Sequence, residues 1–137
     1  MKILFDTNIL ISSAIARGKS RKLLLKALAN EFVLLSSADL LKELEDVISR
    51  PKFLLSTFEI YRFIGIVRKT VKIVDVKSAF KIVKEDPDDD KILNAAYDGN
   101  AKYIVTGDSD LLKLKKFKNI KIVTAAQMLK KLTESHQ

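Results

Sequence analysis

The stretch KILFDTN, residues 2–8, decides the expected fold. Its first four residues form a short, mostly apolar run, and its last three favour turns and helix caps over strand interiors. We therefore predict a strand over residues 2–5 that is followed directly by a loop. This places Asp6 at the carboxyl end of a buried strand, where a carboxylate costs free energy unless a positive group or ion neutralises it. Asp6 is thus the first candidate for a functional residue.

Beyond this opening strand, the hydrophobic pattern predicts helices and strands in alternation. Further strands are expected at residues 32–35, 71–74, 103–106 and 120–123, with a short additional one near Ile82 as an open alternative. Helices are expected at residues 20–30, 38–49, 57–68, 87–98 and 124–132. Connections of this length favour right-handed crossovers between parallel strands over hairpins. We predict an α/β fold of three layers, α/β/α, around a central, mostly parallel sheet of four to five strands.

The helix expected at residues 87–98 has the sharpest boundaries. Pro87 and Asp88 are typical of a helix start, and Gly99 is expected to end the helix in the left-handed conformation. Because crossover helices run antiparallel to the strands, the N-terminus of this helix faces the carboxyl edge of the sheet. Acidic residues in its first turn are therefore directed toward the same edge as Asp6.

Length and composition limit the classes of protein. The 137 residues fit one domain over residues 1–133, with a frayed, disordered tail expected at 134–137. The chain has no cysteine, which excludes disulfides, thiolate zinc sites and a cysteine nucleophile. No apolar run is long enough for a signal peptide or a membrane span, so we expect a cytoplasmic protein. The net charge of +8 favours an anionic partner, although a solvated lysine surface also explains it.

The predicted topology directs four carboxylates from distant segments to one edge of the sheet. Asp6 and Asp108 follow the strands at residues 2–5 and 103–106. Asp90 lies in the first turn of its helix, and Glu43 lies in the first half of the helix at residues 38–49. Open parallel sheets bind ligands beyond the carboxyl ends of their strands, so this convergence indicates a functional site.

Each of these acids also has a plain structural explanation. The aspartates at residues 88–90 could cap a helix and complement its dipole, and Asp108 could be an N-cap. A helical wheel at about 100° per residue puts Glu43 and Glu45 equally far outside the apolar stripe, so periodicity leaves that choice open. The convergence of all four acids favours function.

Four segments of the chain together resemble the PIN-domain family, in particular its toxin ribonucleases from bacterial and archaeal toxin–antitoxin pairs. They are the opening strand with Asp6-Thr7-Asn8, LKELEDVISRPKF at residues 41–53, DPDDDKILNAA at 86–96 and IVTGDSDLL at 104–112. Each segment alone is weakly specific, whereas four in this order and spacing cover almost the whole chain.

The resemblance assigns a role to individual residues. It implies that the helical acid of the family falls on Glu43, which leaves Glu45 on the surface, and that the third and fourth acids fall on Asp90 and Asp108. It implies Asp6 and Asp90 as principal metal ligands, with Glu43 and Asp108 completing the shell or orienting water. The supporting residues would be Asn8 and Thr106, which steady the cluster, and Asp88 and Asp110, which bind metal through water.

Oxygen ligands indicate the kind of metal. Crowded carboxylates repel one another, and a dication supplies the missing positive charge. An all-oxygen set suits Mg²⁺ or Mn²⁺, whereas zinc usually recruits histidine or cysteine. The one histidine, His136, lies in the expected tail and is neither ligand nor base. Such ions activate water and hold a scissile phosphate, so the expected function is a metal-dependent endoribonuclease that hydrolyses RNA phosphodiester bonds.

The expected partners also follow from the resemblance and the charge. The basic residues proposed for the RNA path are Arg17, Lys19, Arg21, Lys22 and Lys113, followed by Lys115, Lys116 and Lys118, with surface solvation as the alternative for each. The family implies a small antitoxin protein and a homodimer. The aromatic side chains that could form a dimer contact are Phe53, Phe58, Tyr61 and Phe63, for which core packing is the alternative.

Other functions fit the sequence less well. The main alternative is a catalytically inactive PIN scaffold that binds metal or RNA. Phosphotransferases of the haloacid-dehalogenase type need aspartates two apart, and here Asn8 stands at the second position. A receiver domain needs an acidic pair after its first strand, which this chain lacks. A serine triad lacks a histidine, and a nucleotide-binding fold lacks a glycine-rich phosphate loop.

Overall fold

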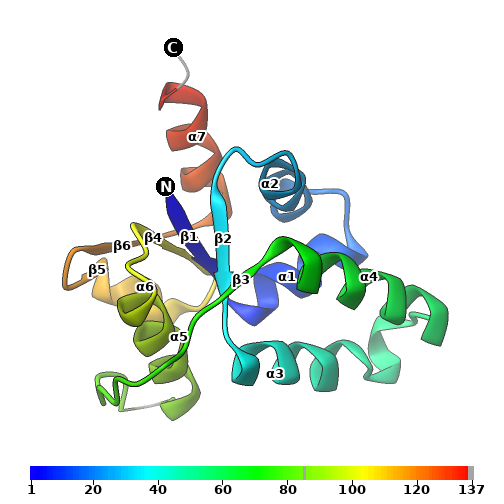
Figure 1. Ribbon diagram of the computed structural model, residues 1–137, viewed down its shortest axis with the longest axis horizontal. Coiled ribbons are helices and arrows are strands. Elements are labelled where there is room, and N and C mark those ends of the chain that lie inside the picture. Colours follow the sequence, from blue (N-terminus) through cyan, green and yellow to red (C-terminus); the bar gives the residue numbers. More distant parts are fainter. Residues whose placement is uncertain (85, 136–137) are drawn as a thin grey trace.

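A six-stranded sheet separates two layers of helices in the computed structural model, which describes residues 1–84 and 86–135 (Figure 1). The strands are β1 (Lys2–Phe5), β2 (Val33–Ser36), β3 (Lys72–Ile73), β4 (Tyr103–Val105), β5 (Lys116–Phe117) and β6 (Ile120–Val123). The helices are α1 (Thr7–Ile15), α2 (Lys19–Leu28), α3 (Ala38–Ile48), α4 (Thr57–Thr70), α5 (Pro87–Asp98), α6 (Ser109–Leu114) and α7 (Ala125–Ser135), with a 3₁₀ turn η1 (Pro51–Phe53). The predicted α/β fold with a mostly parallel sheet is confirmed.

The order of the strands, β3-β2-β1-β4-β6-β5, places a topological switch between β1 and β4. The chain first adds β2 and β3 on one side of β1, and then adds β4 and β6 in parallel on the other side. Asp6 leaves β1 at this switch, and its backbone N–H donates to the carbonyl of Val105 at 2.9 Å. Ligands bind at such switches because the connections on either side diverge and leave a crevice.

Side chains of β1 alternate between two cores on opposite faces of the sheet. Ile3 and Phe5 join a core that includes residues of α1, α2, α3 and α7, whereas Leu4 joins a second core with residues of α5 and α6. Both cores are apolar, as expected for strands covered on both faces. The sheet is therefore buried between the layers, and its carboxyl edge is left for polar side chains.

Several local expectations were wrong. The loop predicted after Asp6 is the helix α1, which begins at Thr7. The sheet has six strands instead of four to five, because β5 forms an unpredicted antiparallel hairpin with β6. The closing helix α7 includes residues 134 and 135, where a disordered tail was expected; residues 136 and 137 lie outside the described part. None of the helices in residues 1–84 and 86–135 combines the length and hydropathy needed to cross a membrane.

Three polar side chains of α5 hold the connection that precedes it. Asp98 accepts the backbone N–H groups of residues 77 and 78, Asn94 pairs with both backbone groups of Phe80, and Asp90 accepts those of residues 82 and 83. The three residues are four apart, so they lie along one face of the helix. These side-chain contacts replace the strand considered near Ile82, which the structure does not contain.

Gly99 follows α5 for a reason other than the one expected. Its φ is −85°, and the left-handed residue is its neighbour Asn100, with a φ of 56°. A Cβ atom at Gly99 would lie 2.8 Å from Leu35 Cδ1 and 2.8 Å from Val74 Cγ2. The glycine is required because the end of α5 packs closely against β2 and the segment after β3.

We expect Gly99→Ala to lower the free energy of unfolding by about 1–3 kcal/mol, since the added methyl overpacks this contact. The matched control is Gly65→Ala, in the interior of α4 with nothing within 4 Å of the new Cβ atom. That variant should gain about 0.5–1 kcal/mol through helix propensity. Urea unfolding of both variants measures the difference, and equal effects at the two positions would contradict the packing argument.

Candidate metal centre

Six carboxylates line one small cavity at the carboxyl edge of the sheet. The cavity has a volume of about 130 Å³ and lies where the starts of α1, α5 and α6 meet the side of α3. Its acidic residues are Asp6, Glu43, Asp86, Asp88, Asp89 and Asp108. Thr7, Asn8, Val47 and Ile92 complete the lining. Segments separated by up to a hundred residues thus bring their negative groups to a single crevice.

Asp6 and Asp108 are joined through Thr106, which is fully buried. The Thr106 hydroxyl donates to Asp6 Oδ2 at 2.7 Å and accepts the backbone N–H of Asp108 at 3.0 Å. Asp108 also caps α6, because its Oδ2 accepts the N–H of Leu111 at 3.1 Å. The Asp108 side chain therefore both caps α6 and lines the cavity. Thr106 fixes Asp6 and Asp108 relative to one another.

Asp89 is the most deeply placed acid of α5, with 7% of its surface exposed. Its Oδ2 is buried and has no hydrogen-bond partner in the described part of the chain. Burial, the proximity of the Asp108 carboxylate, and the charges of Asp108, Asp86 and Asp6 raise its pKa from 3.8 to about 8. A buried carboxylate oxygen without a donor is unfavourable unless a proton or a cation occupies the site beside it.

Glu43 closes the cavity from α3. Its Oε2 accepts the hydroxyl of Thr7 at 3.4 Å, while Glu45 points to Arg68 of α4 and forms an ion pair there. Of the two glutamates, Glu43 therefore lines the cavity and Glu45 does not. Burial and the charges of Asp88 and Asp6 raise its pKa, although Lys91 opposes this. Burial likewise raises the pKa of Asp6, against the hydrogen bond from Thr106 and the backbone N–H groups at residues 7 and 8.

Asp90 is not in the cavity, so the convergence predicted for it was wrong. Its Oδ1 accepts the backbone N–H groups of Ile82 and Val83, both at 2.9 Å. It faces a different, larger cavity of about 630 Å³ between α5 and the connection before it. Its neighbour Asp89 takes the place in the acidic cluster.

A signal for Asp89 is present in the sequence. Asp89 is followed by Ile92, Leu93 and Ala96 at helical spacings of three, four and seven residues, and all four are buried. This places Asp89 on the apolar stripe of α5, whereas residues 88 and 90 lie about 100° to either side. Periodicity therefore distinguishes the inward carboxylate. Asp86, which accepts the N–H of Asp88 at 3.0 Å and caps α5, was also missed.

The donor set fits a hard divalent cation. One carboxylate oxygen from each of Asp89, Asp108 and Asp110 lies within 4.8 Å of the others. All available ligands are oxygens, which suits Mg²⁺ or Mn²⁺. Burial raises the pKa values of Asp6, Glu43 and Asp89 most, and neighbouring negative charge raises them further; a dication removes that repulsion. Asp88, which lines the cavity, and Asp110 also pair with lysines, Asp88 with Lys91 at 3.5 Å and Asp110 with Lys113 at 3.9 Å.

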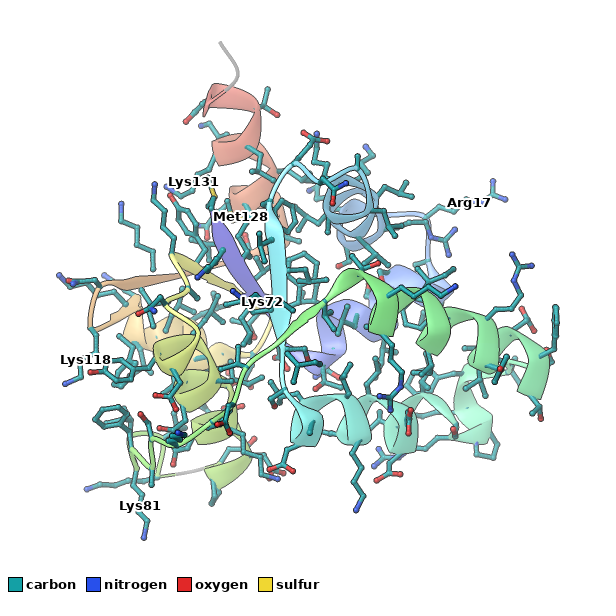
Figure 2. The ribbon with its side chains drawn as sticks, in the orientation of Figure 1. Arg17, Lys72, Lys81, Lys118, Met128 and Lys131 are labelled. Atoms are coloured by element: carbon teal, nitrogen blue, oxygen red, sulfur yellow. The ribbon has the colours of Figure 1, made fainter. Side chains whose placement is uncertain are left out.

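Of the basic residues expected on the RNA path, some are exposed and one is bound to the backbone of α1. Arg21 is committed to the protein, since its guanidinium donates to the carbonyls of Ser13 and Ala14 at the end of α1, both at 2.9 Å. Arg17 extends outward from the loop between α1 and α2 (Figure 2), and Lys19 and Lys22 are exposed on α2. The four residues therefore do not form one continuous surface of free charge.

The aromatic residues considered for a dimer contact divide into two pairs. Phe58 and Tyr61 of α4 are 67% and 79% exposed, so core packing was the wrong alternative for them. Phe53 and Phe63 pack against the main core.

A comparison with protein families gives one match. The model of the PIN domain matches residues 2–110, which include β1, α3, α5, β4 and every acid that lines the cavity. Searches of the curated proteins and of the solved structures give no match.

Proposed function

Because this chain belongs to the PIN domain family, we propose that it is a nuclease of the divalent-metal-dependent kind, an endoribonuclease that hydrolyses RNA phosphodiester bonds. The observation that carries the proposal is the buried, unpartnered oxygen of Asp89 among six carboxylates. Such a cluster is stabilised by a bound cation, and helix capping, which explains Asp86 and Asp108, does not explain the buried Asp89. Mg²⁺ or Mn²⁺ bound there would activate water and neutralise the phosphate under attack.

Different residues of the chain would bind the metal and orient the attacking water. Asp89 and Asp108 would supply inner oxygens together with Asp110 or with Asp6, which Thr106 holds beside Asp108. Glu43, on the opposite wall and with a raised pKa, is suited to orient the attacking water and receive its proton. Without metal, the cavity repels a phosphodiester, so cleavage should depend strictly on the cation.

We further propose that the protein acts in the cytoplasm as the toxin of a toxin–antitoxin pair and is held inactive by a small antitoxin. A homodimer is proposed to form through the exposed aromatic side chains of α4, Phe58 and Tyr61. The alternative function, a PIN scaffold that binds metal or RNA without cutting, would retain the same acids.

The direct test is cleavage of labelled RNA by the purified protein with Mn²⁺ or Mg²⁺. We expect shortened products that disappear with a chelator and fall by on the order of a hundredfold in Asp6→Asn, because a carboxylate ligand is lost. The matched control is Asp75→Asn, since the Asp75 side chain is 86% exposed and pairs with the exposed Lys77. Cleavage that persists in Asp6→Asn would contradict the site, and RNA bound without being shortened would favour the scaffold.

A further inference from the structure

A third cavity gathers several lysine side chains. It has a volume of about 800 Å³ and lies between the end of α6, the β5–β6 hairpin and α7. Five lysines line it: Lys115, Lys116, Lys121, Lys130 and Lys131. We call this surface the lysine groove. Its one acidic residue is Glu134. Figure 2 shows Lys131, on α7, apart from Arg17 of the loop between α1 and α2.

The fold assembles these lysines against local preferences. Lys116 and Lys121 are directly opposite one another in the antiparallel register of β5 and β6, where like charges destabilise a strand pair. Lys115 begins the hairpin with a φ of 60°, which is unfavourable for a residue with a side chain. The turn into the hairpin accounts for the positive φ of Lys115, whereas the facing like charges of Lys116 and Lys121 lower the stability of the strand pair.

The charge of the groove is also uncompensated. In residues 1–84 and 86–135, none of the five lysines forms an ion pair with an acid. The ammonium groups of Lys131 and its neighbour Lys102 instead lie 5.6 and 5.8 Å from the centre of the same aromatic ring, that of Tyr103. An anionic ligand would relieve this repulsion.

The groove is joined to the acidic cavity by one short helix. Asp108, in the cavity, is the N-cap of α6, and Lys115, in the groove, is its C-cap. Six helical residues span about 9 Å, which corresponds to about three phosphates at the axial rise of a nucleic-acid strand. A strand whose phosphate lies at the acidic cavity therefore reaches the groove within a few nucleotides.

We propose that the lysine groove binds the phosphodiester backbone of the RNA that the acidic cavity cleaves, a proposal that rests on the function proposed above. Lysine ammonium groups are point charges suited to phosphate. No aromatic side chain lines the groove, so it has no surface on which bases could stack and its contacts are to the backbone, independent of base sequence. An acidic peptide would match the charge too, but the connection through α6 favours the substrate.

The test compares two triple variants that remove the same charge. The groove variant carries Lys116→Gln, Lys121→Gln and Lys130→Gln. The control variant carries Lys52→Gln, Lys69→Gln and Lys72→Gln, three exposed lysines outside the groove. Binding of a fluorescent single-stranded RNA is measured in chelator at several salt concentrations, so that cleavage and metal play no part.

The groove variant should bind RNA with a salt slope lower by about 2, because each lost phosphate contact removes about 0.7 from it. Its affinity at 0.1 M salt should fall on the order of a hundredfold, while the control stays near the wild type. The Tm of the groove variant should equal or exceed that of the wild type, since the Lys116 and Lys121 repulsion is gone. Equal losses in both variants, or an unchanged slope, would overturn the proposal.

Two further measurements separate this proposal from the ribonuclease function. The first measurement is cleavage of RNA with Mn²⁺. Equal cleavage by the groove variant and the wild type would contradict the proposed role of the groove and leave the ribonuclease function intact. If the wild-type protein binds RNA through the groove but never cleaves it, the ribonuclease function is contradicted and RNA binding by the groove is supported. A polyglutamate peptide that binds the groove more tightly than RNA would overturn the choice of ligand.

Discussion

Asp89→Asn is expected to lower metal-dependent RNA cleavage on the order of a hundredfold, while Asp90→Asn retains most of the activity. Asparagine keeps the size of the side chain but loses the charge that holds a cation. Asp89 is buried in the acidic cavity with an unpartnered oxygen, whereas Asp90 accepts two backbone N–H groups outside it. The pair is well matched because the residues are adjacent in the same helical turn.

The stability of the protein should fall more in Asp90→Asn than in Asp89→Asn, the opposite of the order expected for activity. Asp90→Asn weakens two hydrogen bonds to a charged acceptor and should lower the free energy of unfolding by about 1 kcal/mol. Asp89→Asn removes a buried charge and should leave metal-free protein at pH 8 as stable as the wild type or more so. Cleavage rates and urea unfolding measure the two effects. A large activity loss in Asp90→Asn with little in Asp89→Asn would restore the assignment made from sequence.

Divalent metal is expected to produce the second large effect, a rise in Tm that grows with pH. At a hundred times its dissociation constant, a ligand that binds only the folded state adds about 2.7 kcal/mol, or about 10 °C for a chain of this size. Metal binding requires the carboxyl groups to lose their protons, so the rise should be largest near pH 8 and small near pH 5. Thermal unfolding with and without Mg²⁺ or Mn²⁺ measures it.

Metal-free protein should become less stable as the pH rises from about 4 to about 8. The pKa of Asp89 is about 8 in the folded state and near 3.8 when unfolded, and those of Asp6 and Glu43 are also raised. Across this window the folded state binds more protons than the unfolded state, so the free energy of unfolding falls with pH. Asp89→Asn should flatten the dependence. Stability that rises with pH in this range, or a Tm that metal leaves unchanged, would contradict the acidic cluster.

Much of the fold could be predicted because it is written in local patterns. The strands at β1, β2, β4 and β6 were expected within a residue or two of their observed bounds, and α5 was expected at residues 87–98. Short apolar runs, caps and helical periodicity depend on neighbours in the chain, so they are visible without tertiary structure. The α/β class and the edge that carries the site followed from the alternation of these elements.

The features that were missed depend on contacts between distant residues. The hairpin of β5 with β6 requires Lys115 and Lys118 in positive-φ conformations, which their residue type does not suggest. Gly99 is needed because Leu35 and Val74 approach it from the sheet, and no capping rule includes that contact. These details are set by packing, which overrides local preference.

The sequence by itself indicated the α/β class, a set of carboxylate oxygens, and the edge of the sheet at which Asp6 and Asp108 lie. The helical periodicity of α5 indicates Asp89 as its inward carboxylate, but only the tertiary structure showed that the cavity lies beside it and which lysines share a groove. The physical reason is that rotation of a helix against the sheet, by about 100° from one residue to the next, determines the direction of each side chain. That rotation is fixed by the packing of Ile92 and Leu93 into the core, which buries Asp89 and leaves Asp90 to the connection.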